Sequence, residues 1–409
     1  MRKILMSILL LLLSLACGAQ QLGFQFVDNV KKVSIPVEVL NNLIIVPIVL
    51  NDQLSLKFIL DTGVRTTVLT QKTYSDILKL TYSKEIFVSG PGGKKAAAYV
   101  TDNVRLDLPG VRGSGHSMLV LEEDYLELRN YLGAEVHGIL GYELFSRFIV
   151  QMDYERKRLV LYAPRNYKKK RRYQTLKISV EDTKPFVSAS VNMNEDTEIL
   201  TKLLVDTGAS HGLMLHPGSQ EEIVVPKRHI NSVIGRTLGG VITGKIGRIE
   251  SMQLGKYIIN SPIANFPDPK SNLDTLIKKD TNSRNGALGG EVLSRFNIIF
   301  NFPQEEMYIK KNGSFKRPSN YDMSGITIKA KGAQLRTYEV SELRKGSPAE
   351  QAGVQVGDII VAVNGFMLKR IELNQVNGFF NKKEGKKVRL FIERDGKRQK
   401  IDFRLINQI

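Results

Sequence analysis

The tripeptide Asp61-Thr62-Gly63 occurs a second time in this chain, as Asp206-Thr207-Gly208, 145 residues later. Each copy directly follows an apolar run, at residues 58–60 and 203–205. Asp and Gly are common turn residues, so a single copy would indicate only a loop. Two copies in the same context predict the same turn at the end of two equivalent strands.

A second signature is also duplicated and follows each tripeptide by about eighty residues. Segments 138–148 and 286–296 share Gly, Leu, Gly, Glu, Ser, Arg and Phe in register, with an offset of 148. Because both signatures recur in the same order, the sequence predicts two homologous halves within one chain.

Both halves are predicted to be rich in β-structure. Short apolar strands are expected at 43–50 and 54–60, around the hairpin signal Asn51-Asp52, and again at 186–193 and 199–205. Two more strands are expected after each Ser-Arg-Phe, at 149–153 and 158–162 and at 298–302 and 307–310. One short helix is expected per half, near 142–147 and 291–295.

Between its two signatures, each half carries a glycine-rich strand pair, at 88–96 and 234–244. Glycine permits the tight, mobile tip that a closing flap needs. An ordinary hairpin turn is the alternative, and the position of each segment relative to Asp-Thr-Gly favours a flap.

Two aspartates at equivalent positions suit the hydrolysis of a peptide bond. This reaction needs a base that activates water and an acid that protonates the leaving nitrogen. Two carboxylates about 3 Å apart cannot both ionise, so they share one proton and fill both roles. Gly63 and Gly208 allow sharp turns, and the hydroxyls of Thr62 and Thr207 can cross-link the two loops.

Other catalytic or metal-binding arrangements have little support in the sequence. None of the histidines has metal-ligand spacing with a carboxylate partner, and adjacent Ser210 and His211 cannot form a serine triad. We therefore expect no metal and no cofactor, and a structural or exposed role for His211. The five histidines are His116, His137, His211, His216 and His229.

The N-terminus resembles a targeting segment. Arg2 and Lys3 precede an apolar stretch at 4–13, and small residues follow at 16–19. We expect removal of residues 1–19 and export to the periplasm or cell envelope. Cys17, the only cysteine, offers lipidation as the alternative. The apolar stretch is shorter than a spanning helix needs, and no later segment approaches eighteen apolar residues, so no transmembrane segment is expected in the mature chain.

The chain is basic, with a formal charge of +18 that falls to +16 without Arg2 and Lys3. Export argues against nucleic acid as the partner. Six basic residues between the halves are read as a solvated linker, with an anionic membrane surface as the alternative: Arg165, Lys168, Lys169, Lys170, Arg171 and Arg172.

A third unit follows the second half. Residues 312–324 read as a linker, and Ser347-Pro348 is a helix start with a capping serine and an N1 proline. A helix is expected around 371–381, followed by a hairpin of 388–393 and 399–405 that turns at Asp395-Gly396.

The duplicated part resembles pepsin-like and retropepsin-like aspartic peptidases, over roughly residues 35–311. Besides the two Asp-Thr-Gly loops, it has their apolar-apolar-Gly segments at 139–141 and 287–289. The resemblance implies an all-β, bilobal acid-protease fold of duplicated β-barrels, with lobes at 22–166 and 173–311. It also implies that Asp61 and Asp206 are the catalytic pair and that Thr62 and Thr207 brace them.

Residues 325–409 resemble the PDZ domains of bacterial envelope proteases. The whole chain is similar to exported aspartyl peptidases with a C-terminal PDZ domain from Bacteroidetes-type bacteria. A PDZ groove between a strand and a helix takes a partner's C-terminal peptide. The resemblance implies peptide contacts from Leu335, Tyr338, Val340, Val376 and Phe379. A packing or dimerisation module is the alternative.

The sequence thus favours an exported aspartic endopeptidase acting on proteins or peptides. The alternatives are a non-catalytic peptide-binding scaffold of the envelope and, from charge alone, an adaptor for an anionic surface. Val64 and Ala209 follow the two tripeptides where pepsin-like enzymes often have Ser or Thr. Neither side chain can donate a hydrogen bond to stabilise a charged carboxylate, so we predict a less acidic pH optimum than pepsin's.

Overall fold

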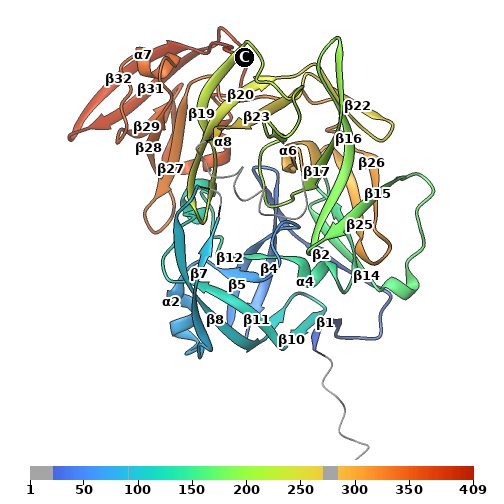
Figure 1. Ribbon diagram of the computed structural model, residues 1–409. Helices are drawn as coiled ribbons and strands as arrows, with labels where there is room; N and C mark the ends of the chain where they lie inside the picture. The colour runs from blue at the N-terminus through green and yellow to red at the C-terminus, as the bar shows by residue number, and fades with distance from the viewer. Residues whose placement is uncertain (1–21, 91, 270–283) are drawn as a thin grey trace, which may run out of the picture.

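The computed structural model describes residues 22–90, 92–269 and 284–409. The expected signal segment 1–19, including Cys17, lies outside the described residues, as does Pro91 in the first glycine-rich turn. The described chain consists mostly of strands, with few and short helices, which confirms the all-β prediction (Figure 1). Within this part of the chain, no helix is long and apolar enough to cross a membrane.

The first lobe is an open sheet with small additions. Its strands are β1 (Gly23–Phe26), β3 (Glu38–Leu40), β4 (Leu43–Leu50), β5 (Leu54–Leu60), β6 (Thr67–Leu69), β7 (Lys84–Ser89), β8 (Lys95–Val104), β9 (Leu106–Asp107), β10 (Val111–Ser114), β11 (His116–Leu121) and β12 (Gly138–Leu140). Its helices are α2 (Lys72–Ile77), α3 (Leu128–Leu132) and α4 (Tyr142–Phe145).

The second lobe repeats this plan. Its elements are β16 (Lys184–Asn194), β17 (Thr197–Val205), β18 (Leu213–Leu215), β19 (His229–Thr237), β20 (Gly240–Arg248), β21 (Ser251–Leu254), β22 (Tyr257–Asn260), β23 (Ile263–Pro267), β24 (Gly286–Leu288) and α6 (Gly290–Leu293). In the first lobe β5 pairs in parallel with β12, β12 is antiparallel to β6, and β6 is parallel to β11. Strands β17, β24, β18 and β23 make the same pairings.

Six strands at one end of a 15-stranded sheet join the lobes, in the order β2-β14-β13-β25-β26-β15. The first half supplies β2 (Lys32–Pro36), β13 (Ile149–Asp153) and β14 (Arg158–Tyr162), and the second supplies β15 (Gln174–Glu181), β25 (Phe296–Asn301) and β26 (Glu306–Lys311). The 3₁₀ turns η1 (Pro164–Asn166) and η3 (Phe302–Gln304) lie beside them. Equivalent strands β13 and β25 pair at the centre of these six strands, so the duplication creates its own interface.

The apolar pattern explains this arrangement. Strands β13 and β25 are buried along almost their whole length, as expected of central strands covered on both faces. One apolar core runs through both lobes and the joining sheet. The strand ladders of the described residues form open paths, so the lobes are folded sheets where the sequence suggested barrels.

The C-terminal unit has a separate apolar core. Its strands are β27 (Ile326–Lys331), β28 (Thr337–Leu343), β29 (Ile359–Val363), β30 (Phe366–Met367), β31 (Lys387–Arg394) and β32 (Lys397–Arg404), with α7 (Pro348–Gln351), η4 (Leu368–Arg370) and α8 (Leu373–Asn377). Its main sheet has the order β27-β28-β29-β31-β32.

Local signals in this unit are largely confirmed. Ser347 caps α7 by accepting a hydrogen bond from the Glu350 N–H (3.4 Å), and Asp395 and Gly396 both have positive φ in the last hairpin. The second helix is shorter than the predicted 371–381, because it ends at Asn377-Gly378, a pair of low helix propensity.

The predicted linker 312–324 packs on the second lobe. The buried Arg295 guanidinium donates to the carbonyls of Phe315 (3.3 Å) and Arg317 (2.6 Å) and to the Ser319 hydroxyl (2.8 Å). The connection to the C-terminal unit is therefore anchored along its length.

Candidate active site

The structure brings the two Asp-Thr-Gly loops together at the junction of the lobes. Each loop follows the last residue of an apolar strand, β5 or β17, and is held by its own apolar-apolar-Gly segment. The Asp61 N–H donates to the Leu140 carbonyl and the Asp206 N–H to the Leu288 carbonyl, both at 2.9 Å. The repeated second signature thus positions the repeated first one.

The two threonines cross-brace the loops, as their hydroxyls were expected to do. The Thr62 N–H donates to Thr207 Oγ1 (3.0 Å), and the Thr207 N–H donates to Thr62 Oγ1 (3.1 Å). Each hydroxyl then donates across to the other lobe, Thr62 to the Val205 carbonyl (2.6 Å) and Thr207 to the Leu60 carbonyl (2.8 Å). Both side chains are fully buried, so these bonds fix the loops with little competition from water.

The carboxyl groups of Asp61 and Asp206 interact at the centre of this brace. The Gly63 N–H donates to Asp61 Oδ1 (2.6 Å) and the Gly208 N–H to Asp206 Oδ1 (3.0 Å). A Cβ on Gly208 would lie only 2.2 Å from Asp61 Cγ, so this position needs glycine. Burial and then the negative charge of Asp206 raise the pKa of Asp61 well above its usual value. A raised pKa in one member is what a proton-sharing pair requires.

The residues after each tripeptide contribute backbone atoms to the loops. The Val64 carbonyl accepts from the Tyr142 N–H (2.9 Å), and the Ala209 carbonyl accepts from the Gly290 N–H (2.6 Å). These bonds tie each loop to the start of the helix that follows the second signature.

His211 lies beside Asp206, closer to the pair than the sequence suggested. Its Nδ1 is buried and has no hydrogen-bond partner among the described residues. Burial lowers the pKa of His211, and the neighbouring Asp206 charge opposes that shift. A neutral imidazole is therefore favoured next to the two carboxyl groups.

The two glycine-rich strand pairs form hairpins whose tips meet. We call β7–β8 the first flap and β19–β20 the second flap. The Lys94 N–H donates to the Gly239 carbonyl (3.0 Å), and Gly92, at φ +101, lies against Gly239 where a Cβ would clash. Leu238, at the second tip, packs in a first-lobe cluster that includes Val64. The tip therefore packs on the first lobe, against the same buried residues as Val64, which directly follows the Asp61 loop.

The predicted peptide-contacting residues of the C-terminal unit lie mostly in its interior. Leu335, Tyr338, Val340 and Val376 are buried in its core, and Phe379 packs against that core from outside. The predicted peptide-binding strand around Tyr338 is β28, which pairs with β27 on one side and β29 on the other. It has no free edge to which a peptide strand could add. The sheet edge next to α8 belongs to β27, which the sequence reading did not single out.

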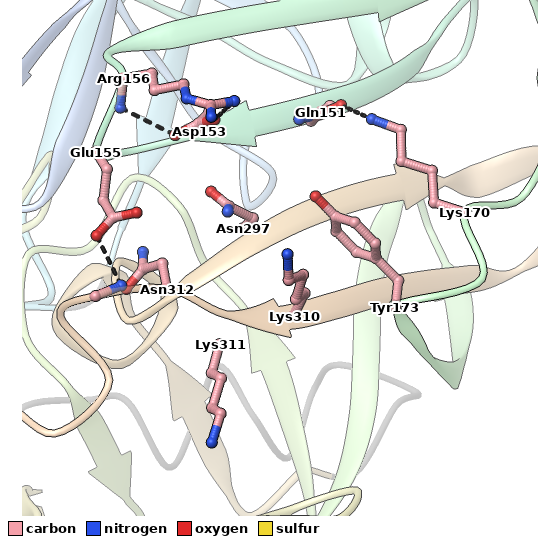
Figure 2. A pocket seen from close by; sticks show the side chains of 11 residues that line it. Gln151, Asp153, Glu155, Arg156, Lys170, Tyr173, Asn297, Lys310, Lys311 and Asn312 are labelled. Carbon is pink, nitrogen blue, oxygen red and sulfur yellow. Dashed lines mark hydrogen bonds and ion pairs between the residues drawn. The ribbon is translucent and has the colours of Figure 1, made fainter.

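A polar pocket of about 390 Å³ lies on the sheet that joins the lobes (Figure 2). It is lined by residues such as Asp153, Lys170 and Asn297 and contains neither aspartate of the pair. Lys170, from the basic segment 165–172, donates there to Gln151 Oε1 (2.7 Å). Part of the predicted solvated linker thus packs on the sheet that joins the lobes.

Comparison with known proteins identifies the class to which this geometry belongs. The family model described as "Aspartyl protease" matches residues 46–144 and 187–292, which together make up half of the chain and contain both Asp-Thr-Gly loops. A PDZ domain model matches residues 339–394. The chain therefore belongs to the aspartyl protease family and carries a C-terminal PDZ domain.

Two similar proteins are also proteases by name. A probable CtpA-like serine protease of Staphylococcus saprophyticus is 33% identical over 132 residues, which are 32% of this chain and 26% of that protein. The chain thus spans about a quarter of the length of this relative. A solved photosystem II D1 C-terminal processing protease is 22% identical over 23% of this chain and 25% of its own, with a TM-score of 0.21.

Proposed function

We propose that this protein is an aspartic-type endopeptidase in which Asp61 and Asp206 activate water for the hydrolysis of peptide bonds. The observation that carries the proposal is the cross-braced pair of carboxyl groups, in which the pKa of Asp61 is raised. Family membership agrees with this mechanism.

The chemistry requires only these two side chains and one shared proton. The ionised carboxylate removes a proton from water, whose oxygen attacks the substrate carbonyl carbon. The protonated carboxyl group stabilises the developing oxyanion. When the carbon–nitrogen bond breaks, the nitrogen leaves with a proton from the pair, and the pair again shares one proton.

The two flaps favour proteins or extended peptides as substrates. Each lobe carries a flap, and the flap tips meet where Leu238 packs against the same first-lobe cluster as Val64. Flaps of this kind can cover an extended strand from both sides and exclude bulk water from the site. From the pattern of residues 1–19, we further propose that the substrates are envelope or extracellular proteins.

The test is hydrolysis of a broad peptide library across pH by the wild type, Asp61→Asn and Asp206→Asn. We expect both variants to lose at least about a thousandfold in kcat/KM, because each lacks half of the pair. Asp28→Asn, in the N-terminal segment, is the matched control and should cleave like the wild type. Cleavage by Asp206→Asn at the wild-type rate would overturn the proposed mechanism.

Inhibitors separate this mechanism from the serine chemistry named for the Staphylococcus relative. A peptide with a statine-type hydroxyl mimics the tetrahedral intermediate and should inhibit, whereas a serine-directed sulfonyl fluoride should not. A wild type that cleaves no peptide of the library would instead favour the non-catalytic scaffold.

A further inference from the structure

The free edge of β27 is already in contact with another part of this chain. Helix α3 of the first lobe packs against β27. The Asn130 side chain donates to the Ala330 carbonyl (2.8 Å), and Arg129 Nη2 donates to the Ala333 carbonyl (2.9 Å). Glu127, just before α3, pairs with Lys329 at 2.6 Å.

These contacts use the side of β27 that an added peptide strand would use. Backbone groups alternate between the two sides of a strand. The Thr327 carbonyl points towards β28, where it accepts from the Ser341 hydroxyl (3.2 Å). Because successive residues face opposite sides, the backbone groups of Ile328 and Ala330 point to the open side of β27. The Asn130 amide takes the place of a strand backbone at Ala330.

The same segment also reaches the other wall of this groove. Gly133, which ends α3 at φ +64, abuts Leu373 at the start of α8, and a Cβ on Gly133 would lie 2.5 Å from Leu373 Cβ. At the opposite end of β27, the N–H groups of Ser324 (3.0 Å) and Gly325 (2.6 Å) bind the carboxylate of Asp322. Strand β27 and helix α8 thus both contact the α3 segment, and the two N–H groups just before β27 already have a carboxylate partner within the chain.

This junction is connected to the second flap. Arg236, on β19 two residues before Leu238, forms an ion pair with Glu342 on β28. The Arg236 guanidinium also lies 4.1 Å from the ring centre of Tyr131 in α3, and Lys329 Nζ lies 5.1 Å from the same ring. We call Tyr131, Arg236, Lys329 and Glu342 the latch. Figure 1 shows the β19–β20 hairpin passing the C-terminal unit on its way to the first lobe.

We propose that helix α3 is an internal occupant of the PDZ groove, and that a peptide strand which displaces it from β27 also releases the second flap and activates the peptidase. The displacing ligand is an extended peptide with a free C-terminal carboxylate. It replaces Asn130 along β27, and its terminus replaces the Asp322 carboxylate on the Ser324 and Gly325 N–H groups. Withdrawal of Leu238 from the cluster at Val64 then opens the site.

The inference rests on the proposed peptidase function, so one readout must be independent of catalysis. Glu342→Gln removes one end of the latch, and Asn130→Ala removes the hydrogen bond that holds α3 on β27. We call these two proteins the latch variants. The matched control is Glu339→Gln, which breaks the pair of Glu339 with Lys331 (2.5 Å) inside the PDZ domain. All three positions are near the surface, and we expect all three variants to fold.

Hydrogen exchange is the catalysis-independent readout. Amides of the second flap should exchange about tenfold faster in Asn130→Ala and in Glu342→Gln than in the wild type, and unchanged in Glu339→Gln. Flap exchange that is the same in all four proteins would overturn the coupling, whatever their activity.

Cleavage and peptide binding complete the test in the full-length protein. The two latch variants should show several-fold higher kcat/KM, and a decapeptide library with free C-terminal carboxylates should bind them more tightly than the wild type. Peptides that bind should also raise wild-type cleavage of a separate quenched substrate, and the same peptides with C-terminal amides should not.

Equal cleavage by wild type and latch variants, with Asp206→Asn inactive, would refute the latch and leave the peptidase function intact. A wild type without any cleavage, but with faster flap exchange in the variants, would refute the peptidase function and support the coupling between the latch and the flap.

Discussion

At the scale of single residues, Thr62 and Thr207 do more than brace two loops. Each accepts a hydrogen bond from the other's backbone and donates one to the opposite lobe, so the carboxyl groups and the lobe interface depend on the same two hydroxyls. Catalytic geometry and interlobe stability are therefore linked.

Thr207→Val tests this link. Valine has nearly the same shape but leaves the buried Thr62 N–H without a partner, so we expect a loss of about 1–3 kcal/mol in the free energy of unfolding and a large drop in kcat. Denaturant unfolding and steady-state kinetics measure the two effects. In the control Thr201→Val, which breaks a bond to the Ala189 carbonyl (2.7 Å) within one lobe, only stability should fall. Equal kcat values for the two variants would contradict the link.

The raised pKa of Asp61 sets an expectation for the pH profile. Burial and the Asp206 charge keep this carboxyl group protonated to higher pH than a free aspartate. On the alkaline side the pair loses activity when the shared proton is lost, so the alkaline limb of kcat/KM should lie above the usual aspartate range. A pH–rate profile measures this, and an optimum near about pH 2, below even the upper pepsin pKa, would contradict it.

At the scale of elements, the arginines of the two Ser-Arg-Phe segments bind different parts of the chain. In the first lobe the exposed Arg147 donates to the Leu22 carbonyl (2.9 Å) near the N-terminus. In the second lobe Arg295 is buried, pairs with Glu291 at 2.5 Å and holds segment 312–324. The same residue at equivalent positions thus fastens two different ends of the peptidase.

Arg295→Met should destabilise the protein by about 3–5 kcal/mol, because Glu291 would be left without its buried partner. Arg147→Met, its repeat equivalent, should cost below about 1 kcal/mol. Chemical denaturation measures both, and limited proteolysis should cut within 312–324 only in Arg295→Met. A similar loss of unfolding free energy in the two variants would show that the burial of Arg295 does not make its contribution to stability larger than that of Arg147.

Elements also differ in how far the sequence predicts them. Strands β4 and β5 begin and end at the predicted residues, because apolar runs flank a turn at Asn51-Asp52 where both residues have positive φ. Helix α3 was not predicted. It has five residues, too few for a helical period to show, and its ends at Glu127 and Gly133 depend on packing against the C-terminal unit.

At the scale of the whole molecule, buried histidines oppose stability in acid. Burial lowers the pKa of His216 to about 3, and also lowers those of His211 and His137. A histidine in the unfolded chain has a pKa of about 6.5 and binds a proton below that pH. The buried histidines of the folded chain do not bind this proton until the pH is lower, so the folded state loses stability as pH falls. Asp61 acts in the opposite direction, because its raised pKa favours the folded state in acid.

We therefore expect the free energy of unfolding to fall between pH 7.5 and 5.5, by up to about 1.4 kcal/mol per pH unit for each histidine that stays neutral in the fold. Denaturant titrations at several pH values measure the slope. His216→Asn removes one titrating group and should flatten it, and a slope that is unchanged in this variant would show that His216 does not contribute.

The sequence by itself determined the duplication, the all-β class, the pairing of Asp61 with Asp206 and the presence of a third unit. These follow from patterns repeated along the chain, and a repeat needs no knowledge of distant contacts. Tertiary structure alone decided which strand of the PDZ domain has a free edge, that α3 covers it and that Arg236 joins it to a flap. Those contacts join residues about 100 to 200 positions apart through single side chains, and a single occurrence leaves no pattern in a sequence.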